Sequence, residues 1–178
     1  ALEDALREKK HVLSAAEENI LAQLSEVTGA TNDIFKMLNN ADLTFGTVVD
    51  EDGDTVNLTH GNYITFMESH NRDLRKAAFT NMYEAYKAHI NTIATTYNYN
   101  VKNDVVSARI RKYDSARQAA LSAGNIPEEV YDNLIAVVHE YLPILHRYIA
   151  LRKKVLGVEE LKMYDVYVPL VELPKKDI

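Results

Sequence analysis

Two histidines and a glutamate lie close together in the stretch HEYLPILH, residues 139–146. In the metal-binding motif H-E-x-x-H, two imidazoles one helical turn apart bind one zinc ion, and the glutamate polarises its water. Here the second histidine follows the first by seven residues, which is roughly 10 Å along a helix. Two Zn–N bonds of about 2 Å each do not span that distance, and a bend at Pro143 does not close it. His139, Glu140 and His146 are therefore interpreted as polar positions on a packed helix, and no metal site is predicted there.

An acidic cluster, DEDGD at residues 50–54, is a second candidate for metal binding. An EF-hand calcium loop needs glycine at its sixth position and glutamate at its twelfth. Counting from Asp50, these positions hold Thr55 and Gly61. The cluster is therefore expected to be a solvated turn.

Further catalytic motifs are not found in the sequence. It contains neither a glycine-rich phosphate loop nor a G-x-S-x-G nucleophile elbow. We therefore assign no catalytic, cofactor-binding or metal-binding residue. The cationic stretches at 109–112 and 151–154 are expected to face solvent. The other histidines show no ligand spacing with one another: His11, His60, His70 and His89.

Composition describes an ordinary soluble globular protein. Of the 178 residues, 47% are apolar and 26% are charged, which argues against disorder and membrane spans. The net charge of -6 and the pI near 5.5 argue against a binder of nucleic acid or anionic membranes, because those need a positive field. The absence of cysteine excludes disulfides and thiol chemistry, and no signal peptide is seen at the start, so a cytoplasmic location is expected. The first residue is Ala and the last segment is rich in proline, which suggests a piece of something longer.

Helical periodicity dominates the chain. Ser14 and Glu17 form the pattern of a capping box at the start of a helix that ends at Thr28-Gly29. Pro127 opens a long helix with a kink expected at Pro143 and an end at Gly157. An apolar stripe from Phe79 to Tyr97 predicts one helix over roughly 71–99 with a break near Asn100. Shorter helices are expected around 34–38, 106–110 and 115–121.

Two segments depart from the helical pattern. Residues 45–58 contain two β-branched runs around an Asp/Gly-rich tip, which predicts a β-hairpin turning near Gly53. Such a hairpin is too short to be stable alone, so one apolar side should rest on helices. Residues 163–173 are rich in Tyr, Val and Leu and are expected to be extended or irregular. The predicted fold is mainly α: a multi-helix, bundle-like lobe with one β-hairpin and an extended C-terminal segment.

Four stretches resemble the oligoendopeptidase F family of zinc metallopeptidases, which are relatives of thimet oligopeptidase. They are HVLSAAEENILAQL (11–24), NRDLRKAAFTNMYEAY (71–86), NIPEEVYDNLI (125–135) and LHRYIALRKKVLGVEELKMYDVYVPL (145–170). The resemblance covers nearly all of the chain. In that family, H-E-x-x-H and a downstream glutamate bind zinc, and both lie C-terminal to the matching part. This sequence has no H-E-x-x-H, so the resemblance transfers no catalytic residue to it.

The resemblance implies the N-terminal portion of a zinc-dependent oligoendopeptidase, in which a deep channel admits short peptides and excludes folded proteins. Residues 1–124 would be a helical lobe with the hairpin, and residues 125–178 a long kinked helix and an extended segment leading into a catalytic domain. This part would supply scaffold and channel wall, and would bind no zinc and be inactive alone. Self-association through exposed apolar faces is then expected. The alternative is a stand-alone helical protein-interaction module.

Overall fold

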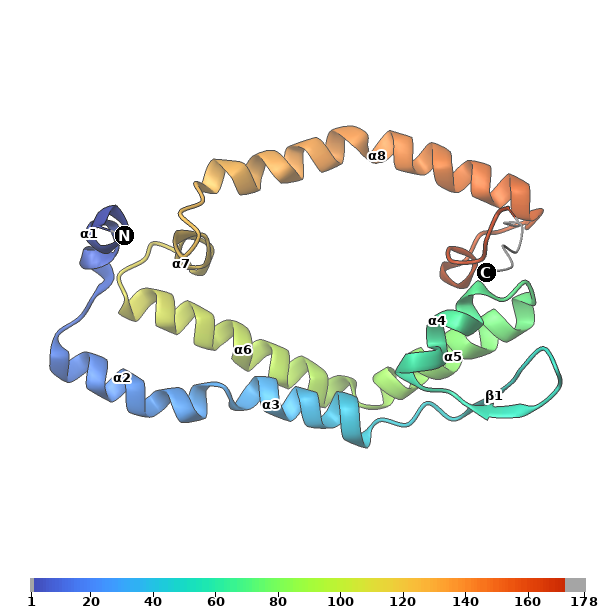
Figure 1. Ribbon diagram of the computed structural model, residues 1–178, viewed down its shortest axis with the longest axis horizontal. Coiled ribbons are helices and arrows are strands. Elements are labelled where there is room, and N and C mark those ends of the chain that lie inside the picture. The colour runs from blue at the N-terminus through green and yellow to red at the C-terminus, as the bar shows by residue number, and fades with distance from the viewer. Residues whose placement is uncertain (1, 172–178) are drawn as a thin grey trace, which may run out of the picture. The chain divides into compact units, whose positions relative to one another are not determined.

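The computed structural model describes residues 2–171, and most of them are helical (Figure 1). The fold class predicted from the sequence, mainly α with one hairpin, is confirmed. The α-helices are α1 (Leu2–Glu8), α2 (Ala15–Thr28), α3 (Ala30–Met37), α4 (His60–Glu68), α5 (Arg72–Ala88), α6 (Ile90–Ile110), α7 (Ala116–Ser122) and α8 (Glu128–Leu156). The strands are β1 (Thr47–Val49) and β2 (Thr55–Asn57), and single 3-10 or π turns cover Lys9–His11, Leu38–Asp42 and Met163–Asp165.

The described residues form two compact units, each made of two separate stretches of the chain. The first unit comprises 2–42 and 90–138, and the second comprises 43–89 and 139–171. Helix α8 contributes its N-terminal part to the first unit and the remainder to the second. The predicted boundary between 124 and 125 concerns the domains of a longer protein, and it stays a prediction.

The first unit is organised by α3 and α6, which lie side by side (Figure 1). The predicted capping box is present at the start of α2: the Ser14 hydroxyl accepts from the backbone N–H of Glu17, and the Glu17 carboxylate accepts from that of Ser14. Glu18 accepts two hydrogen bonds from Arg111, at 3.0 and 3.1 Å, which joins α2 to the end of α6. Local capping and long-range ion pairing therefore both fix α2.

The second unit contains the hairpin, and its location confirms the prediction. β1 and β2 pair antiparallel with Val48 opposite Val56. Val48 is buried, and the side chain of Asn81 on α5 donates a 2.9 Å hydrogen bond to the carbonyl of Thr47. The side chains at the tip, residues 51–54, are exposed. One side of the hairpin therefore rests on α5, as its small size requires.

The helix expected over 71–99 is in fact two helices, because the chain breaks at His89. The imidazole Nδ1 of His89 donates to the carbonyl of Ala85 at 3.0 Å, while its backbone N–H donates to Tyr86 instead. The side chain thus takes the acceptor that the next helical hydrogen bond would use. The break expected near Asn100 was wrong, since α6 runs through that residue. The apolar stripe keeps its spacing across His89 and so does not reveal the break.

The ends of α8 agree with the sequence prediction. Glu128 and Glu129 lie in its first turn and lysines in its last, as the helix dipole favours. Gly157 has φ +65°, and the N–H groups of Gly157 and Val158 donate to the carbonyls of Lys154 and Lys153. This is a Schellman motif, in which a left-handed glycine closes the helix.

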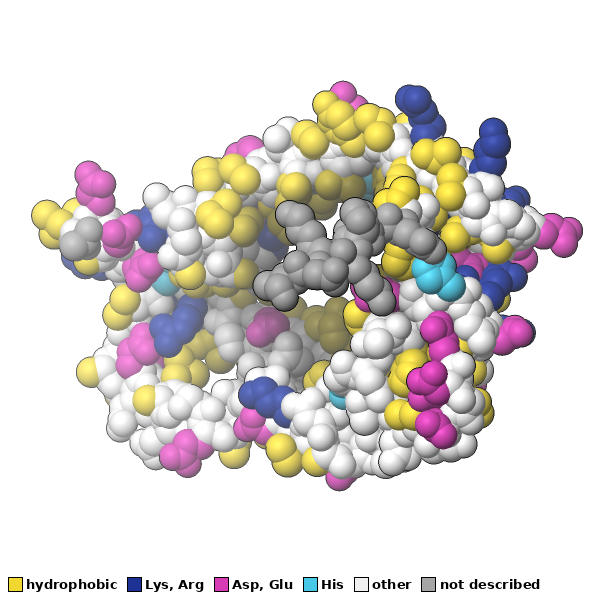
Figure 2. Space-filling view, turned by 45° about the vertical axis from the view of Figure 1, so that its right-hand side comes forward, with side chains coloured by type: hydrophobic (Ala, Val, Ile, Leu, Met, Phe, Trp, Pro, Cys, Tyr) yellow, Lys and Arg dark blue, Asp and Glu magenta, His cyan; other side chains and the backbone are white. Residues whose placement is uncertain are grey.

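Most apolar side chains of α8 are exposed, and Arg152 is its one buried residue among those described. Figure 2 shows hydrophobic side chains gathered along this helix, at the top of the view. The apolar stripe that follows Pro127 is therefore left largely uncovered by the described residues. By length and composition alone α8 is also apolar enough to cross a membrane. A buried core helix of a larger soluble body has the same composition. The exposed stripe consists of Val130, Leu134, Val137, Tyr141, Tyr148 and Val155.

The hairpin turn depends on a backbone conformation that favours glycine. Gly53 has φ +89°, so Gly53→Val is expected to lower the free energy of unfolding by about 1 kcal/mol or more. Gly29→Val is the matched control, because Gly29 has φ -78° and a Cβ there would meet no atom within 4 Å. Urea unfolding followed by circular dichroism measures both. Equal stability of the two variants would contradict a strained turn at Gly53.

Candidate functional site

The structure places His139, Glu140 and His146 on α8, where all three side chains are exposed. The helix is continuous through Pro143, so the two imidazoles remain two helical turns apart. In the part of the chain that the structure describes, no group of three or more His, Asp or Glu side chains could hold a metal ion. The residues present therefore do not fit a zinc centre.

We expect the 178-residue chain to hold no stoichiometric zinc. The reason is geometric, since the His-Glu-His cluster on α8 is too widely spaced to share one ion. Elemental analysis after dialysis, with His139→Ala and His146→Ala as comparisons, measures this directly. One tightly held zinc per chain, lost in either variant, would show that this part of the chain is a metal site.

At the acidic tip of the hairpin, the first carboxylate, that of Asp50, accepts hydrogen bonds from backbone N–H groups of the turn. Asp50 Oδ1 accepts from the backbone N–H groups of Asp52 and Asp54, at 3.0 and 2.9 Å. This is the Asx-type turn that aspartate commonly forms. The segment therefore has a structural explanation in its own hydrogen bonds, in agreement with the sequence interpretation of DEDGD.

The strongest electrostatic feature is a buried carboxylate that binds two arginines. Asp165 is fully buried. Its Oδ1 accepts from Arg75 Nη2 at 2.8 Å and from Arg72 Nε at 3.1 Å. Its Oδ2 accepts from Arg72 Nη2 at 2.8 Å and from the backbone N–H of Lys162 at 2.9 Å. The segment around 162–165 is thereby tied to the first turn of α5.

A third arginine donates hydrogen bonds to backbone carbonyls of the same segment. Arg152 on α8 is buried and donates from Nε to the carbonyl of Asp165 at 2.9 Å. It also donates to the carbonyl of Val168 and, from Nη1, to the Tyr148 hydroxyl at 3.1 Å. We call Arg72, Arg75, Arg152 and Asp165 the arginine cluster. It joins α5, α8 and the segment 162–168.

The charge state of Asp165 follows from this environment. Burial alone would raise the pKa of the carboxyl group, but the hydrogen bonds from Arg72, Arg75 and the N–H of Lys162 outweigh it and hold that pKa well below its usual range. Asp165 is therefore ionised at neutral pH. A carboxylate held so firmly in this form is suited to structural pairing and not to proton transfer.

Sequence reasoning missed this cluster. The stretch 151–154 was expected to face solvent, which was wrong for Arg152, because its guanidinium satisfies backbone carbonyls that the irregular segment leaves without ladder partners. The spacing of Arg72 and Arg75 places both on one helix face. The local sequence, however, does not indicate that Arg75 pairs with Asp165, which lies 90 residues away.

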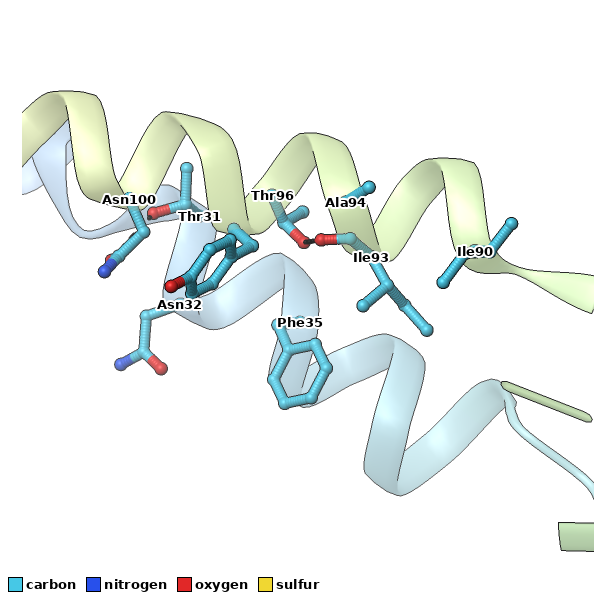
Figure 3. Close-up of a pocket in the computed structure, with 9 residues that line it drawn as sticks. Thr31, Asn32, Phe35, Ile90, Ile93, Ala94, Thr96 and Asn100 are labelled. Carbon is cyan, nitrogen blue, oxygen red and sulfur yellow. Dashed lines mark hydrogen bonds between the residues drawn. The ribbon is translucent and has the colours of Figure 1, made fainter. Parts of the chain in front are cut away.

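Both units contain concave surfaces among the described residues. The first, of about 450 Å³, lies between α3 and α6. In Figure 3 the Phe35 ring, from α3, and the Ile93 side chain, from α6, lie on its walls. Thr96 uses its hydroxyl to bond the carbonyls of Thr92 and Ile93 in its own helix, so it offers a ligand little polar recognition.

The second cavity, of about 400 Å³, adjoins the arginine cluster. Its polar lining comes from His70, Arg72 and Arg75. The rest of its lining is apolar and comes from the end of α8 and the segment that follows: Val155, Leu156, Val158, Val168, Pro169, Leu170 and Val171.

Comparison with family models gives two matches along the chain. Residues 65–176 match the model of Peptidase family M3, and residues 1–45 match the model of Oligopeptidase F. The first of these covers more than half of the chain. No residue of the zinc motif H-E-x-x-H is among the matched positions, since the sequence lacks that motif.

Individual relatives match over almost all of this chain but only part of their own. Oligopeptidase PepF of Bacillus subtilis is 54% identical over 97% of this chain and 26% of its own length. Group B oligopeptidase PepB of Streptococcus agalactiae is 52% identical over 93% of this chain and 28% of its own length. The crystal structure of oligoendopeptidase-F from Enterococcus faecium superposes with a TM-score of 0.94 at 45% identity, covering 96% of this chain and 34% of that one. The chain thus spans about a quarter of the length of these curated relatives.

Proposed function

Because this chain belongs to peptidase family M3, we propose that it is the N-terminal portion of a zinc-dependent oligoendopeptidase that hydrolyses internal bonds of short peptides. The supporting observation is the 54% identity to an oligopeptidase across 97% of the chain. Identity at that level implies shared structure, and activity is inferred from the names of the relatives. The relatives are about four times longer, so the activity is proposed for the longer protein.

The zinc in this proposal is held elsewhere in the longer protein. The described residues offer no group of three ligands, and the His-Glu-His spacing on α8 does not fit. No chemical step is therefore assigned to a side chain of this portion. The proposed contribution is structural: scaffold and one wall of a channel that admits short, unstructured peptides.

Two features of the described residues support a scaffold role. Hydrogen bonds join segments far apart in the chain, as at Glu18 with Arg111 and Asp165 with Arg75. The exposed apolar stripe of α8 calls for cover by further protein, because a helix apolar on most sides is ordinarily buried. A cytoplasmic location and short peptides as partners complete the proposal; nucleic acid and membrane are not expected to bind.

The proposed function is tested with a quenched-fluorescent peptide of about eight residues, offered with zinc to the 178-residue chain and to an extended protein that contains the downstream region. Hydrolysis needs a metal-bound water and a glutamate base within hydrogen-bonding distance. We therefore expect cleavage by the extended protein alone. Cleavage by the rigorously purified short chain, blocked by a chelator, would contradict the scaffold role.

The exposed stripe of α8 also favours a second candidate, a helical module that binds other proteins and has no catalytic partner. The two candidates differ in the downstream reading frame. Translation into an H-E-x-x-H helix supports the peptidase, whereas a stop codon directly after Ile178 supports the module. Either way, self-association of the chain at high concentration is expected through the same stripe.

A further inference from the structure

The cavity beside the arginine cluster combines surplus positive charge with an apolar wall. Four cations lie in this region: Arg72, Arg75, Arg152 and Lys162. Two carboxylates accompany them: Asp165, bound by Arg72 and Arg75, and Glu160, whose carboxylate pairs with Lys162 at 2.6 Å. Asp73 also acts on Arg72, and Lys153 on Glu160. Five positive groups against three negative ones leave a local charge of +2, although the protein as a whole carries -6.

One guanidinium in this cavity has donors to spare. Arg72 uses Nε for Asp165, and Nη2 for Asp165 and the carbonyl of Glu160. Its Nη1 donates to no residue in the described range 2–171. The side chain of Arg72 is 42% exposed, so a ligand can reach it, whereas Arg75 is buried beneath. Asp165 holds the Arg72 guanidinium in place. The side chain therefore loses less conformational entropy when a ligand binds.

From this geometry we propose that the cavity binds the free C-terminal carboxylate of short apolar peptides. The Nη1 hydrogens of Arg72 would donate to the carboxylate, and the surplus charge would favour an anion over a neutral or cationic ligand. The apolar walls formed by Val155, Leu156, Pro169 and Leu170 would take the terminal side chain. A volume of about 400 Å³ suits a ligand the size of a dipeptide.

The choice of a peptide, among possible carboxylates, rests on the proposed function. Each hydrolysed peptide bond creates one new C-terminal carboxylate, so an oligopeptidase constantly meets this group. Binding is measured on the 178-residue chain and hydrolysis on the extended protein, so failure of one proposal is distinguishable from failure of the other.

The first test compares two ligands by isothermal titration calorimetry: N-acetyl-Leu-Leu as the free acid and as its C-terminal amide. The acid is expected to bind about tenfold more tightly or better, because a charged hydrogen bond is lost in the amide. Hexanoate, an apolar carboxylate without a peptide bond, should bind more weakly than the acetylated dipeptide. Equal binding of acid and amide, or no binding of the acid, would overturn the site. Equal binding of hexanoate would overturn its assignment to peptides.

The second test uses two matched variants. Arg72→Gln removes the spare donors and one charge, and should weaken binding of the acid about tenfold. Arg109→Gln is the control, because Arg109 is exposed on α6 in the other unit. Circular dichroism measures whether both variants fold. If Arg72→Gln does not fold, the comparison of acid and amide in the unmodified chain still tests the proposal. Unchanged affinity in folded Arg72→Gln would contradict the proposal.

Discussion

Asp165→Asn is expected to lower the free energy of unfolding by about 3–5 kcal/mol. The carboxylate is fully buried and accepts four hydrogen bonds, three of them from guanidinium groups. Asparagine has a similar shape but is neutral, and its NH2 group would face donors. Removing one partner of a buried ion pair leaves the other charge uncompensated, which explains the size of the effect.

Urea unfolding followed by circular dichroism measures this loss. Asp33→Asn is the control, since Asp33 is exposed and its pairing with Lys36 at 3.5 Å is a surface contact worth less than about 1 kcal/mol. A loss below about 1 kcal/mol in Asp165→Asn would show that the arginine cluster does not stabilise the second unit.

The same residue gives stability a pH dependence with a definite sign. The pKa of Asp165 is lower in the folded protein than in the unfolded chain, where it is about 3.9. Its contribution is therefore fully present above that unfolded pKa and is lost as the pH falls below about 4. The stability difference between the unmodified chain and Asp165→Asn should narrow over that range. A constant difference from pH 6 down to pH 3 would contradict an ionised Asp165.

Features set by neighbouring residues were predictable from the sequence. The Ser14–Glu17 capping box, the hairpin around Gly53 and the helix end at Gly157 each depend on hydrogen bonds or dihedral angles within a few residues. Such patterns leave a local signature, because only certain residue types satisfy them. The predictions for these elements were therefore accurate to within a few residues.

The features that sequence reasoning missed depend on non-local or competing interactions. At the break, the imidazole of His89 donates to the carbonyl of Ala85, which the helix would otherwise use as an acceptor. The spacing of apolar residues does not reveal this hydrogen bond. Arg75 finds Asp165 only after the chain has folded back over 90 residues. Arg152 precedes two lysines, and such a cationic run is typical of a solvent-facing surface. Composition therefore predicted an exposed Arg152, whereas the residue is buried.

Met67→Ala is the second variant expected to have a large effect, with a loss of about 2–5 kcal/mol. Met67 lies on α4, which packs on α5, and its side chain has no solvent exposure. Truncation removes three heavy atoms from a packed interior and leaves a void that rigid neighbours fill only partly. The neighbouring core contains Leu74 and Ala78 of α5. Loss of packing there should loosen the support on which the hairpin rests.

The control for this variant is Met37→Ala at the end of α3, where the side chain is 60% exposed. Both substitutions delete the same atoms and install the same good helix former, so helix propensity cancels in the comparison. Met37→Ala is expected to change the free energy of unfolding by less than about 0.5 kcal/mol. Hydrogen exchange should also rise at the amides of β1 and β2 in Met67→Ala, since α5 supports the hairpin. Similar losses in the two variants would mean that the α4–α5 contact does not form the core of the second unit.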